Sequence, residues 1–242
     1  MLYKKIIVIP TFNESKRLNV QRFHEFFGSV KSKNTLVIFS NDGSNDNTLE
    51  VLIEIKKKFD SKTIIHDFSI NEGKSETIRK SFIKCVNDYN FEVISFLDCD
   101  LSTDIFECNE LMDDVSDDKV IVFGSRISKI DNQIERRFIR HILGRLFSKV
   151  TYFFFDIKSY DSQCGCKCFR KKIVDDLFQE KFESNWIFDI EIFLRLKKIG
   201  FDLERNTIEK PLNRWIDKEG SKISFSYFLL IWVDLYKIYK KY

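Results

Sequence analysis

Two carboxylates stand one residue apart in Asp98-Cys99-Asp100, directly after the apolar run at residues 93–97. No Lys or Arg is adjacent in the sequence, so the two side chains would repel each other unless a divalent cation lay between them and a diphosphate. Carboxylate oxygens are hard ligands that suit Mg²⁺ or Mn²⁺. One such pair is weak evidence alone, because acidic residues also end strands on solvated surfaces.

Two more acidic residues follow apolar runs earlier in the chain. Glu14 stands shortly after residues 5–9, and Asp42 stands shortly after residues 35–39. Each carboxylate could accept hydrogen bonds from a base or a ribose, and Gly43 would let the backbone approach a ligand closely. Polar residues in these turns also suit helix capping, but capping alone does not explain Glu14 or Asp42.

The elements that must position these side chains alternate regularly in the first half of the chain. Apolar runs of strand length occupy residues 5–9, 35–39, 63–65 and 93–97, and helical patterns occupy residues 20–30, 47–59 and 73–89. The runs suggest burial on both faces, which is typical of parallel strands. We therefore predict an α/β fold with a doubly wound, mainly parallel sheet flanked by helices, and ligands at the carboxyl ends of its strands.

The second half is less regular. Strands are predicted at residues 120–123 and 164–169, and helices at residues 135–155, 189–198 and 225–242. We expect one domain over residues 1–223 and a C-terminal amphipathic helix over residues 224–242. That helix could dock on a membrane or a partner, or it could complete the core.

Composition narrows the functional classes. Lys and Arg number 40 against 37 Asp and Glu in 242 residues, so charge gives no reason to expect a nucleic acid as partner. The 25 Phe, against 2 Pro and 8 Gly, favour a well-buried core. No run reaches the roughly 18 apolar residues that span a bilayer. Without a secretory signal, the six cysteines indicate reduced thiols in the cytoplasm.

Cys164, Cys166 and Cys168 share one face of a predicted strand. They could begin a zinc or iron–sulfur site, but no other pair lies nearby in the sequence to complete it. We interpret them as small buried side chains.

Several motifs in the chain resemble those of a known family. Five segments, in the family's order, resemble the motifs of family 2 glycosyltransferases with the GT-A fold: Pro10-Thr11-Phe12-Asn13-Glu14, Asn41-Asp42-Gly43-Ser44, Asn71-Glu72-Gly73-Lys74, Asp98-Cys99-Asp100 and Gly124-Ser125-Arg126. Later segments resemble its dolichyl-phosphate and polyprenyl-phosphate glucosyltransferase branch: Asp161-Ser162-Gln163-Cys164-Gly165, residues 186–191, and Trp215 with residues 220–222. The resemblance spans about residues 3–225, and the joint match is more specific than any one motif.

The resemblance implies roles for particular residues. The donor would be bound by Pro10, Thr11, Glu14, Asp42, Lys74 and Asp98, with Lys74 near the diphosphate, and the Mg²⁺ or Mn²⁺ would be held by Asp98 and Asp100. The acceptor would be bound by Arg126, Arg136, Arg137, Gln163 and Trp215. The chain departs from the family at Asn41, where members often have Asp, and at Cys99, which replaces a small residue. From the sequence we expect no counterpart of the N-terminal membrane anchor of the eukaryotic members.

The implied reaction is inverting transfer of a hexose, with glucose and UDP-glucose favoured, to a polyprenyl or dolichyl phosphate. A lipid phosphate is already anionic at neutral pH and needs no strong general base. A sugar hydroxyl would need one, and Asp189 or Glu191 would then be the candidate, although acids are also favoured in the first turn of a helix. The predicted catalytic residues are Asp98, Asp100, Arg126 and Asp189.

The helix predicted at residues 135–155 mixes arginines with aromatic and aliphatic residues, which suits an anionic membrane surface. An amphipathic helix packed on the sheet would have a similar pattern. We expect a cytoplasmic protein, peripheral on the cytoplasmic face of a membrane.

Other functions stay open at this point. The chain could be a glycosyltransferase that extends a cell-surface polysaccharide at a sugar hydroxyl, or a nucleotide-sugar-binding protein without activity. A sugar-phosphate nucleotidyltransferase would normally have a Gly-rich, basic loop after the first strand, where this chain has Pro10 to Glu14.

Overall fold

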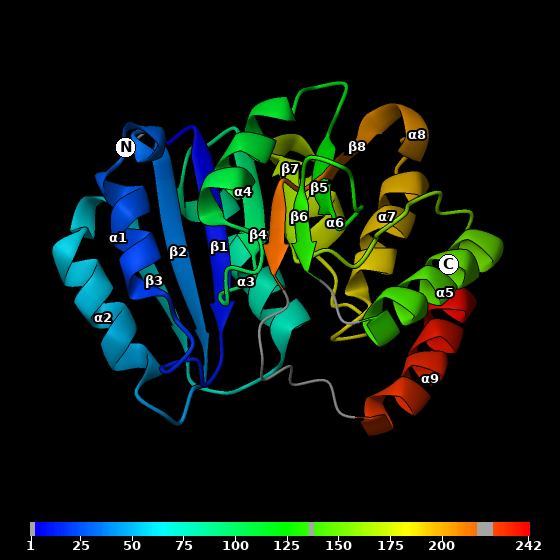
Figure 1. The fold of residues 1–242 in the computed structure, drawn as a ribbon, viewed down its shortest axis with the longest axis horizontal. Coiled ribbons are helices and arrows are strands. Elements are labelled where there is room, and N and C mark those ends of the chain that lie inside the picture. The colour runs from blue at the N-terminus through cyan, green and yellow to red at the C-terminus, as the bar shows by residue number, and fades with distance from the viewer. Residues whose placement is uncertain (1–2, 136–137, 217–224) are drawn as a thin grey trace.

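The computed structural model describes residues 3–135, 138–216 and 225–242, and its centre is a seven-stranded sheet (Figure 1). The strand order is β3-β2-β1-β4-β7-β5-β8. The strands are β1 (Lys5–Thr11), β2 (Thr35–Asp42), β3 (Thr63–Phe68), β4 (Val93–Leu97), β5 (Ile121–Ser125), β7 (Cys166–Arg170) and β8 (Thr207–Pro211). β7 runs antiparallel to β4 and β5, and the other pairings are parallel. This confirms the predicted α/β fold with a mainly parallel sheet.

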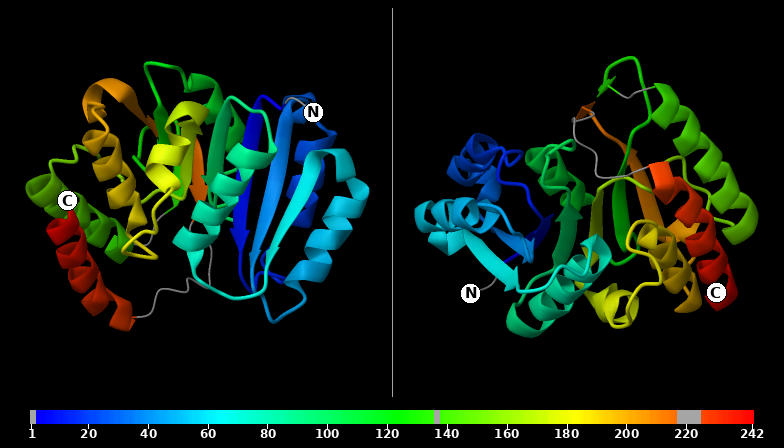
Figure 2. Two further views of the ribbon diagram at one scale, coloured as in Figure 1. Left: turned by 180° about the vertical axis from the view of Figure 1, so that it is seen from behind. Right: turned by 90° about the horizontal axis from the view of Figure 1, so that it is seen from below.

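Helices cover both faces of the sheet (Figure 2). One face carries α1 (Val20–Gly28), α2 (Thr48–Lys58) and α4 (Ile105–Leu111). The other carries α3 (Lys74–Asp88), α6 (Val174–Phe178), α7 (Phe188–Lys198) and α9 (Phe225–Lys241). The remaining helices are α5 (Phe138–Phe155) and α8 (Leu203–Asn206), with 3₁₀ turns η1 (Val30–Ser32), η2 (Asp60–Lys62), η3 (Met112–Asp114) and η4 (Lys171–Ile173).

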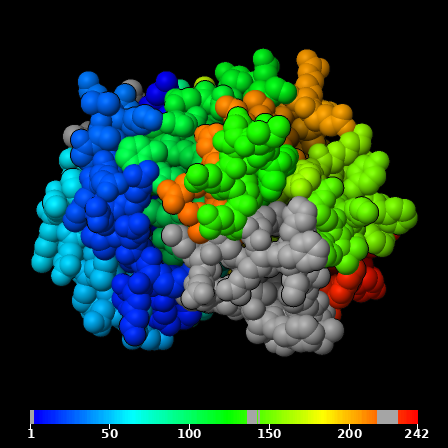
Figure 3. All heavy atoms as spheres, viewed as in Figure 1, coloured from blue at the N-terminus to red at the C-terminus, as the bar shows by residue number. Residues whose placement is uncertain are grey.

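A separate two-stranded sheet corrects the predicted start of the helix at residue 135. β6 (Gln133–Glu135) pairs in parallel with β9 (Arg214–Ile216), and Figure 3 shows these segments together on one surface of the molecule. Glu135 is therefore the end of a strand, and the helix starts at Phe138. The pairing is with a segment about 80 residues away in sequence, and such contacts override a local helical pattern.

The C-terminal helix α9 has one face in the core. Leu235 and Ile238 are buried in the core on the face of the sheet that carries α3, α6 and α7. Tyr239 contacts the rings of Phe154 and Phe155 on α5. Figure 2 shows α5 and α9 side by side in both views. No helix among the described residues is long and apolar enough to cross a membrane.

The cysteines of β7 are buried thiols, as predicted, but they have a neighbour that the sequence did not indicate. Cys108 of α4 lies against Cys166 and Cys168, and the three sulfur atoms are within 4.8 Å of one another. Among the residues that the structure describes, no fourth ligand joins these three enclosed thiols, and we interpret them as part of the core between α4 and the sheet.

Candidate active site

The two carboxylates of the acidic pair lie in the turn that follows β4. The amide of Leu101 donates to the Asp98 carbonyl at 3.1 Å, and Leu101 has a φ of 52°. Asp100 Oδ1 accepts a hydrogen bond from the amide of Ser102 at 2.9 Å. The turn therefore presents both acidic side chains at the carboxyl end of a central strand, the edge where doubly wound sheets bind ligands.

Each of these carboxylates has a cationic partner from another element, which corrects the sequence-based argument that no Lys or Arg lies beside them. Lys74 Nζ, at the start of α3, is 2.5 Å from Asp98 Oδ1. Arg17 bridges Asp100 Oδ2 and Glu14 Oε1, at 3.2 Å from each. Arg17 was missed because its only sequence signal is its position three residues after Glu14.

Gly165 makes room for the carboxylate of Asp98. The amide of Asp98 donates to the Gly165 carbonyl at 3.0 Å, which holds the two backbones together. A Cβ atom built on Gly165 would lie 2.0 Å from Asp98 Oδ2. No side chain larger than hydrogen fits at residue 165 without moving Asp98.

The predicted nucleotide-binding residues gather at the carboxyl ends of β1 and β2. Thr11, Glu14 and Asp42 are all buried, and Pro10, which lies opposite Ser40 in the register of these strands, is partly buried. Their clustering fits a site for a base and a ribose at this edge of the sheet. Their individual roles stay predictions.

Asp42 supports the turn that leads into α3. Its Oδ1 accepts from the amide of Glu72 at 3.0 Å, and its Oδ2 accepts from the amide of Gly73 at 2.9 Å. Gly73 has a φ of 92°, a left-handed conformation that favours glycine. Burial raises the pKa of Asp42, against the opposing hydrogen bonds from Thr77 and Gly73. Through this turn, Asp42 sets the position of Lys74.

Lys74 faces several acids at once. Burial works against its charged form, but Asp98, then Asp189 and Asp100, outweigh that effect, so the pKa of Lys74 is raised. Its ammonium is therefore held charged beside the acidic pair. This is the place expected for a cation that meets a donor diphosphate.

Asp189 and Glu191, the two candidates for a general base, have different surroundings. Asp189 Oδ1 is 2.6 Å from Nζ of Lys167, a lysine that sequence reasoning missed. Burial raises the pKa of Asp189, against Lys167 and Lys74. Glu191 accepts from the amides of Glu183 and Ser184 at 2.8 and 3.2 Å, so it anchors the loop before α7.

The predicted acceptor residues are only partly brought together. Arg126 donates through Nε and Nη2 to the two carboxylate oxygens of Asp161, at 2.6 Å each, and its guanidinium carbon lies 5.2 Å from the ring centroid of Trp215. Burial opposes the charged form of Arg126, but Asp161 outweighs it and raises the pKa of Arg126. The carbonyl of Gln163 accepts from Nη2 at 3.3 Å. Arg136 and Arg137 lie outside the described residues.

A carboxylate on β8 fixes the segment that carries Asp161. Glu209 Oε1 accepts from the amide of Asp161 at 2.7 Å and from Ser125 Oγ at 2.6 Å, and its Oε2 accepts from the amide of Tyr160 at 2.8 Å. Glu209 was not predicted, because its sequence neighbours give no hint of these partners.

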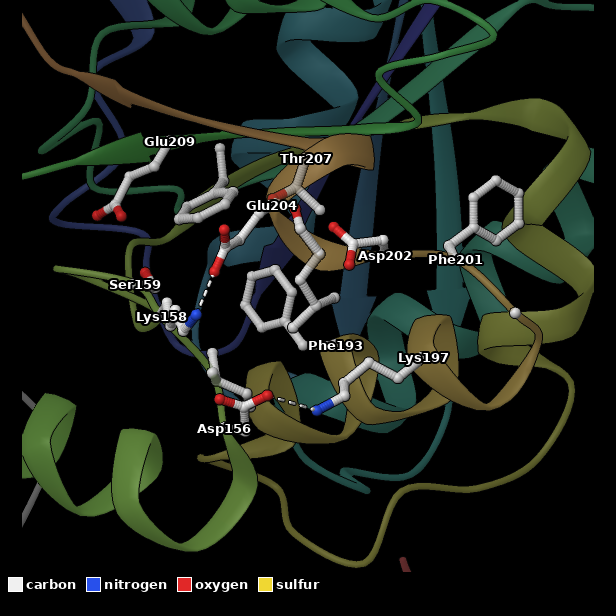
Figure 4. A pocket seen from close by; sticks show the side chains of 14 residues that line it. Asp156, Lys158, Ser159, Phe193, Lys197, Phe201, Asp202, Glu204, Thr207 and Glu209 are labelled. Atoms are coloured by element: carbon white, nitrogen blue, oxygen red, sulfur yellow. Dashed lines mark hydrogen bonds and ion pairs between the residues drawn. The ribbon is translucent and has the colours of Figure 1, made fainter.

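A hollow of about 810 Å³ lies near β8, and no member of the acidic pair lines it (Figure 4). Four of its charged side chains form two ion pairs: Lys158 Nζ is 2.5 Å from Glu204 Oε1, and Lys197 Nζ is 3.5 Å from Asp156 Oδ2. Glu209, which also lines the hollow, accepts hydrogen bonds from Ser125, Tyr160 and Asp161, so these groups already have partners within the protein. We therefore place the chemistry at the acidic pair.

A doubly wound sheet with an acidic pair after a central strand, and a lysine beside that pair, is the arrangement that the resemblance to GT-A glycosyltransferases implies. The chain belongs to glycosyl transferase family 2, whose family model matches residues 6–178.

Two relatives confirm the resemblance to the glucosyltransferase branch. The chain is 27% identical over 245 residues to dolichyl-phosphate beta-glucosyltransferase of Saccharomyces cerevisiae, covering 91% of this chain and 69% of the relative. It is 26% identical over 250 residues to dolichyl-phosphate beta-glucosyltransferase of Dictyostelium discoideum, covering 98% and 74%.

A solved structure confirms the fold. Glucosyl-3-phosphoglycerate synthase from Mycobacterium tuberculosis, in complex with Mn²⁺, uridine diphosphate and phosphoglyceric acid, matches with a TM-score of 0.68 at 11% identity, over 98% of this chain and 78% of that chain.

Proposed function

We propose that this protein transfers glucose, with inversion, from UDP-glucose to a polyprenyl or dolichyl phosphate. The observation that carries the proposal is the cluster at the carboxyl end of β4, where Asp98 meets Lys74 and Asp100 meets Arg17. Carboxylates suit a divalent metal, and the two cations suit a diphosphate. The relatives named as dolichyl-phosphate beta-glucosyltransferases support the choice of sugar and acceptor.

The acidic pair fits Mg²⁺ or Mn²⁺. Both carboxylates are partly open to solvent, with side chains 40% exposed for Asp98 and 21% for Asp100, so an ion can reach them. Asp98 and Asp100 would hold the metal, which would supply positive charge to offset the negative charge that develops on the departing nucleoside diphosphate. Lys74 and Arg17 would add charge-assisted hydrogen bonds to the phosphate oxygens as they leave their carboxylates.

The acceptor phosphate supplies its own anionic oxygen. That oxygen forms a bond to the anomeric carbon as the bond to the nucleoside diphosphate breaks on the opposite side, which inverts the configuration. No proton has to be removed from a phosphate oxygen that is already ionised. Arg126 is our candidate for the acceptor phosphate, because its bonds to Asp161 and Gln163 use Nε and Nη2 and leave Nη1 out.

Helices α5 and α9 are our candidates for the surface that meets a membrane. Their exposed apolar and aromatic side chains are Ile142, Leu146, Tyr152, Phe153, Phe154, Leu230, Trp232, Val233, Tyr236 and Tyr239. Lysines such as Lys149 and Lys237 lie on the same helices and would favour anionic lipid head groups. A peripheral position on the cytoplasmic face would let the protein meet a lipid phosphate while the lipid chain stays in the bilayer.

Transfer of radiolabelled glucose from UDP-glucose to a short polyprenyl phosphate, with Mg²⁺ or Mn²⁺, tests the proposal. Wild type should form a metal-dependent lipid-linked product, and Asp100→Ala should form almost none. Asp60→Ala, which removes an exposed carboxylate that is not part of the proposed site, serves as the control and should keep full activity. Product formed on an oligosaccharide but not on the lipid phosphate would contradict the proposed acceptor.

A further inference from the structure

Lys167 is a lysine enclosed in the middle of the sheet. It lies on β7 and its side chain is 0% exposed. Its Nζ is 5.7 Å from the ring centroid of Phe96 on β4 and 5.8 Å from that of Phe123 on β5. The ammonium has two polar neighbours: the Cys164 carbonyl at 2.8 Å and Asp189 Oδ1 at 2.6 Å.

Packing alone does not explain a charge at this position. Taking an ammonium and a carboxylate out of water costs several kcal/mol for each ion, and well-packed apolar residues of similar volume often serve as well. A methionine at residue 167 would fill the space between the two phenyl rings without that cost. We therefore attribute the lysine at this position to its ion pair with the Asp189 carboxylate.

Asp189 connects the buried lysine to the donor site. It lies in the first turn of α7. Lys74 Nζ is 5.8 Å from the ring centroid of Phe96, the same ring that Lys167 Nζ approaches to 5.7 Å, so the two ammonium groups flank one ring and Asp189 is bonded to one of them. The charge of Asp189, with those of Asp98 and Asp100, acts on the Lys74 ammonium. Positive and negative groups thus alternate from the core to the acidic pair, in the order Lys167, Asp189, Lys74 and Asp98.

We propose that Lys167 is a positioning residue that holds Asp189 as a carboxylate beside Lys74, so that Asp189 directs the Lys74 ammonium toward the donor diphosphate. In this arrangement Asp189 is an electrostatic element of the donor site and takes no proton from the acceptor. The inference rests on the proposed use of a nucleotide diphosphate sugar, and it adds a residue that the motifs did not indicate.

Removing the ammonium should make donor binding depend on pH. Among the described residues, the charged groups that act most strongly on the Asp189 carboxylate are Lys167 of β7, which is paired with it, Lys74 of α3 and Asp98 after β4. Without Lys167, burial would favour the protonated form of Asp189 more strongly, and a neutral Asp189 would no longer act on Lys74. Donor affinity should therefore be lowest at low pH and recover as pH rises and Asp189 ionises.

The experiment is calorimetric titration of the full chain with UDP-glucose and Mg²⁺, from about pH 6 to about pH 9. Lys167→Met should weaken binding by about 10- to 100-fold near pH 6, as is typical for partners that orient a binding group, and the loss should shrink toward high pH. Lys167→Met combined with Asp189→Asn should bind weakly at every pH, because nothing is left to ionise. UMP, which lacks the second phosphate, should bind all variants alike.

Two results would overturn the inference. One is wild-type affinity of Lys167→Met for UDP-glucose across the pH range. The other is a pH-independent loss that UMP shares, since this would show a general distortion of the site. If the single variant does not fold, the double variant decides, and wild-type affinity for UDP-glucose in that protein would also overturn the role.

The titration separates this inference from the proposed function. It uses donor and metal alone, so it reports on Lys167 whether or not a polyprenyl phosphate accepts glucose. If the wild type binds UDP-glucose but transfers nothing to the lipid phosphate, the proposed acceptor is wrong. The role of Lys167 is then still decided by the pH dependence of donor binding.

Discussion

Replacing Gly165 by alanine should disable the acidic pair without unfolding the protein. The new Cβ would lie 2.0 Å from Asp98 Oδ2 and 2.4 Å from its Cγ, whereas ordinary contacts begin near 3.4 Å. Asp98 must therefore move by about 1 Å or more, and a displacement of that size at a reacting centre costs on the order of 100-fold in rate. Gly165 does not have a positive φ, so its backbone accepts alanine and the effect is steric.

The same variant should be nearly as stable as wild type. Asp98 has a side chain that is 40% exposed, so it can turn into solvent and lose little more than its ion pair with Lys74. Partly exposed pairs of this kind contribute about 0–1 kcal/mol. Urea unfolding should therefore change the free energy of unfolding of Gly165→Ala by about 1 kcal/mol or less.

The assay is metal-dependent transfer from UDP-glucose, measured over a range of Mn²⁺ concentrations. Gly165→Ala should resemble Asp98→Ala, with a loss of about 100-fold that saturating Mn²⁺ does not fully restore. Gly28→Ala is the matched control, because a Cβ at that helix end meets nothing within 4 Å. Wild-type activity in Gly165→Ala would refute the view that this glycine sets the position of Asp98.

Three further predictions follow from other parts of the molecule. Arg17→Met should weaken UDP binding about 10-fold with UMP binding unchanged, in calorimetry with Mn²⁺, because Arg17 is expected to move from Asp100 to the second phosphate; equal losses for both nucleotides would contradict this. Burial raises the pKa of Glu191 from its ordinary 4.5 to about 7. Its contribution to stability is then full below about pH 4.5 and lost as pH rises to about 7, so Glu191→Gln should flatten the pH dependence of urea unfolding in that window; an unchanged slope would contradict it. Trp232→Glu on α9 should reduce flotation with anionic lipid vesicles, whereas Val30→Glu, at a more exposed apolar residue elsewhere, should not; equal flotation of both would exclude α9 from the membrane surface.

The fold of the first half follows from local sequence, because each apolar run is flanked by its own turn and helix. The strand register of β1 and β2 then brings Thr11 opposite Asn41, so predicted turn residues meet at one edge of the sheet. The second half could not be predicted as well. Glu135 falls in β6 because of a pairing with β9, and no local pattern encodes a partner that far along the chain.

The same limit explains which site residues were found. The spacing of Asp98 and Asp100 identifies them as candidates in the sequence. The cations that pair with them, Arg17 and Lys74, come from the turn after β1 and from the start of α3. Lys167 stands between Cys166 and Cys168, and nothing in that local sequence indicates a charged partner. Only the packing of α7 on the sheet brings it to Asp189. Sequence motifs thus predicted candidate ligand-binding groups such as Asp98 and Lys74, and missed Arg17 and Lys167, whose importance shows only in contacts with other elements.

Asp98 and Asp100 are each paired with a cation, so binding of the donor and metal must exchange these ion pairs for new ones. If Asp98 and Asp100 hold the metal as proposed, an ion that binds alone would have to compete with Lys74 for Asp98 and with Arg17 for Asp100, and the loss of those two pairs would lower its affinity. A diphosphate that binds alone offers both cations new partners but leaves the two carboxylates uncompensated beside it. If metal and diphosphate bind together as proposed, the carboxylates of Asp98 and Asp100 would hold the metal and the cations of Lys74 and Arg17 would pair with the phosphates, so both sets of groups would keep partners. Each ligand would then raise the affinity of the other by the same factor, and the cluster would favour the diphosphate and the metal together over either one alone.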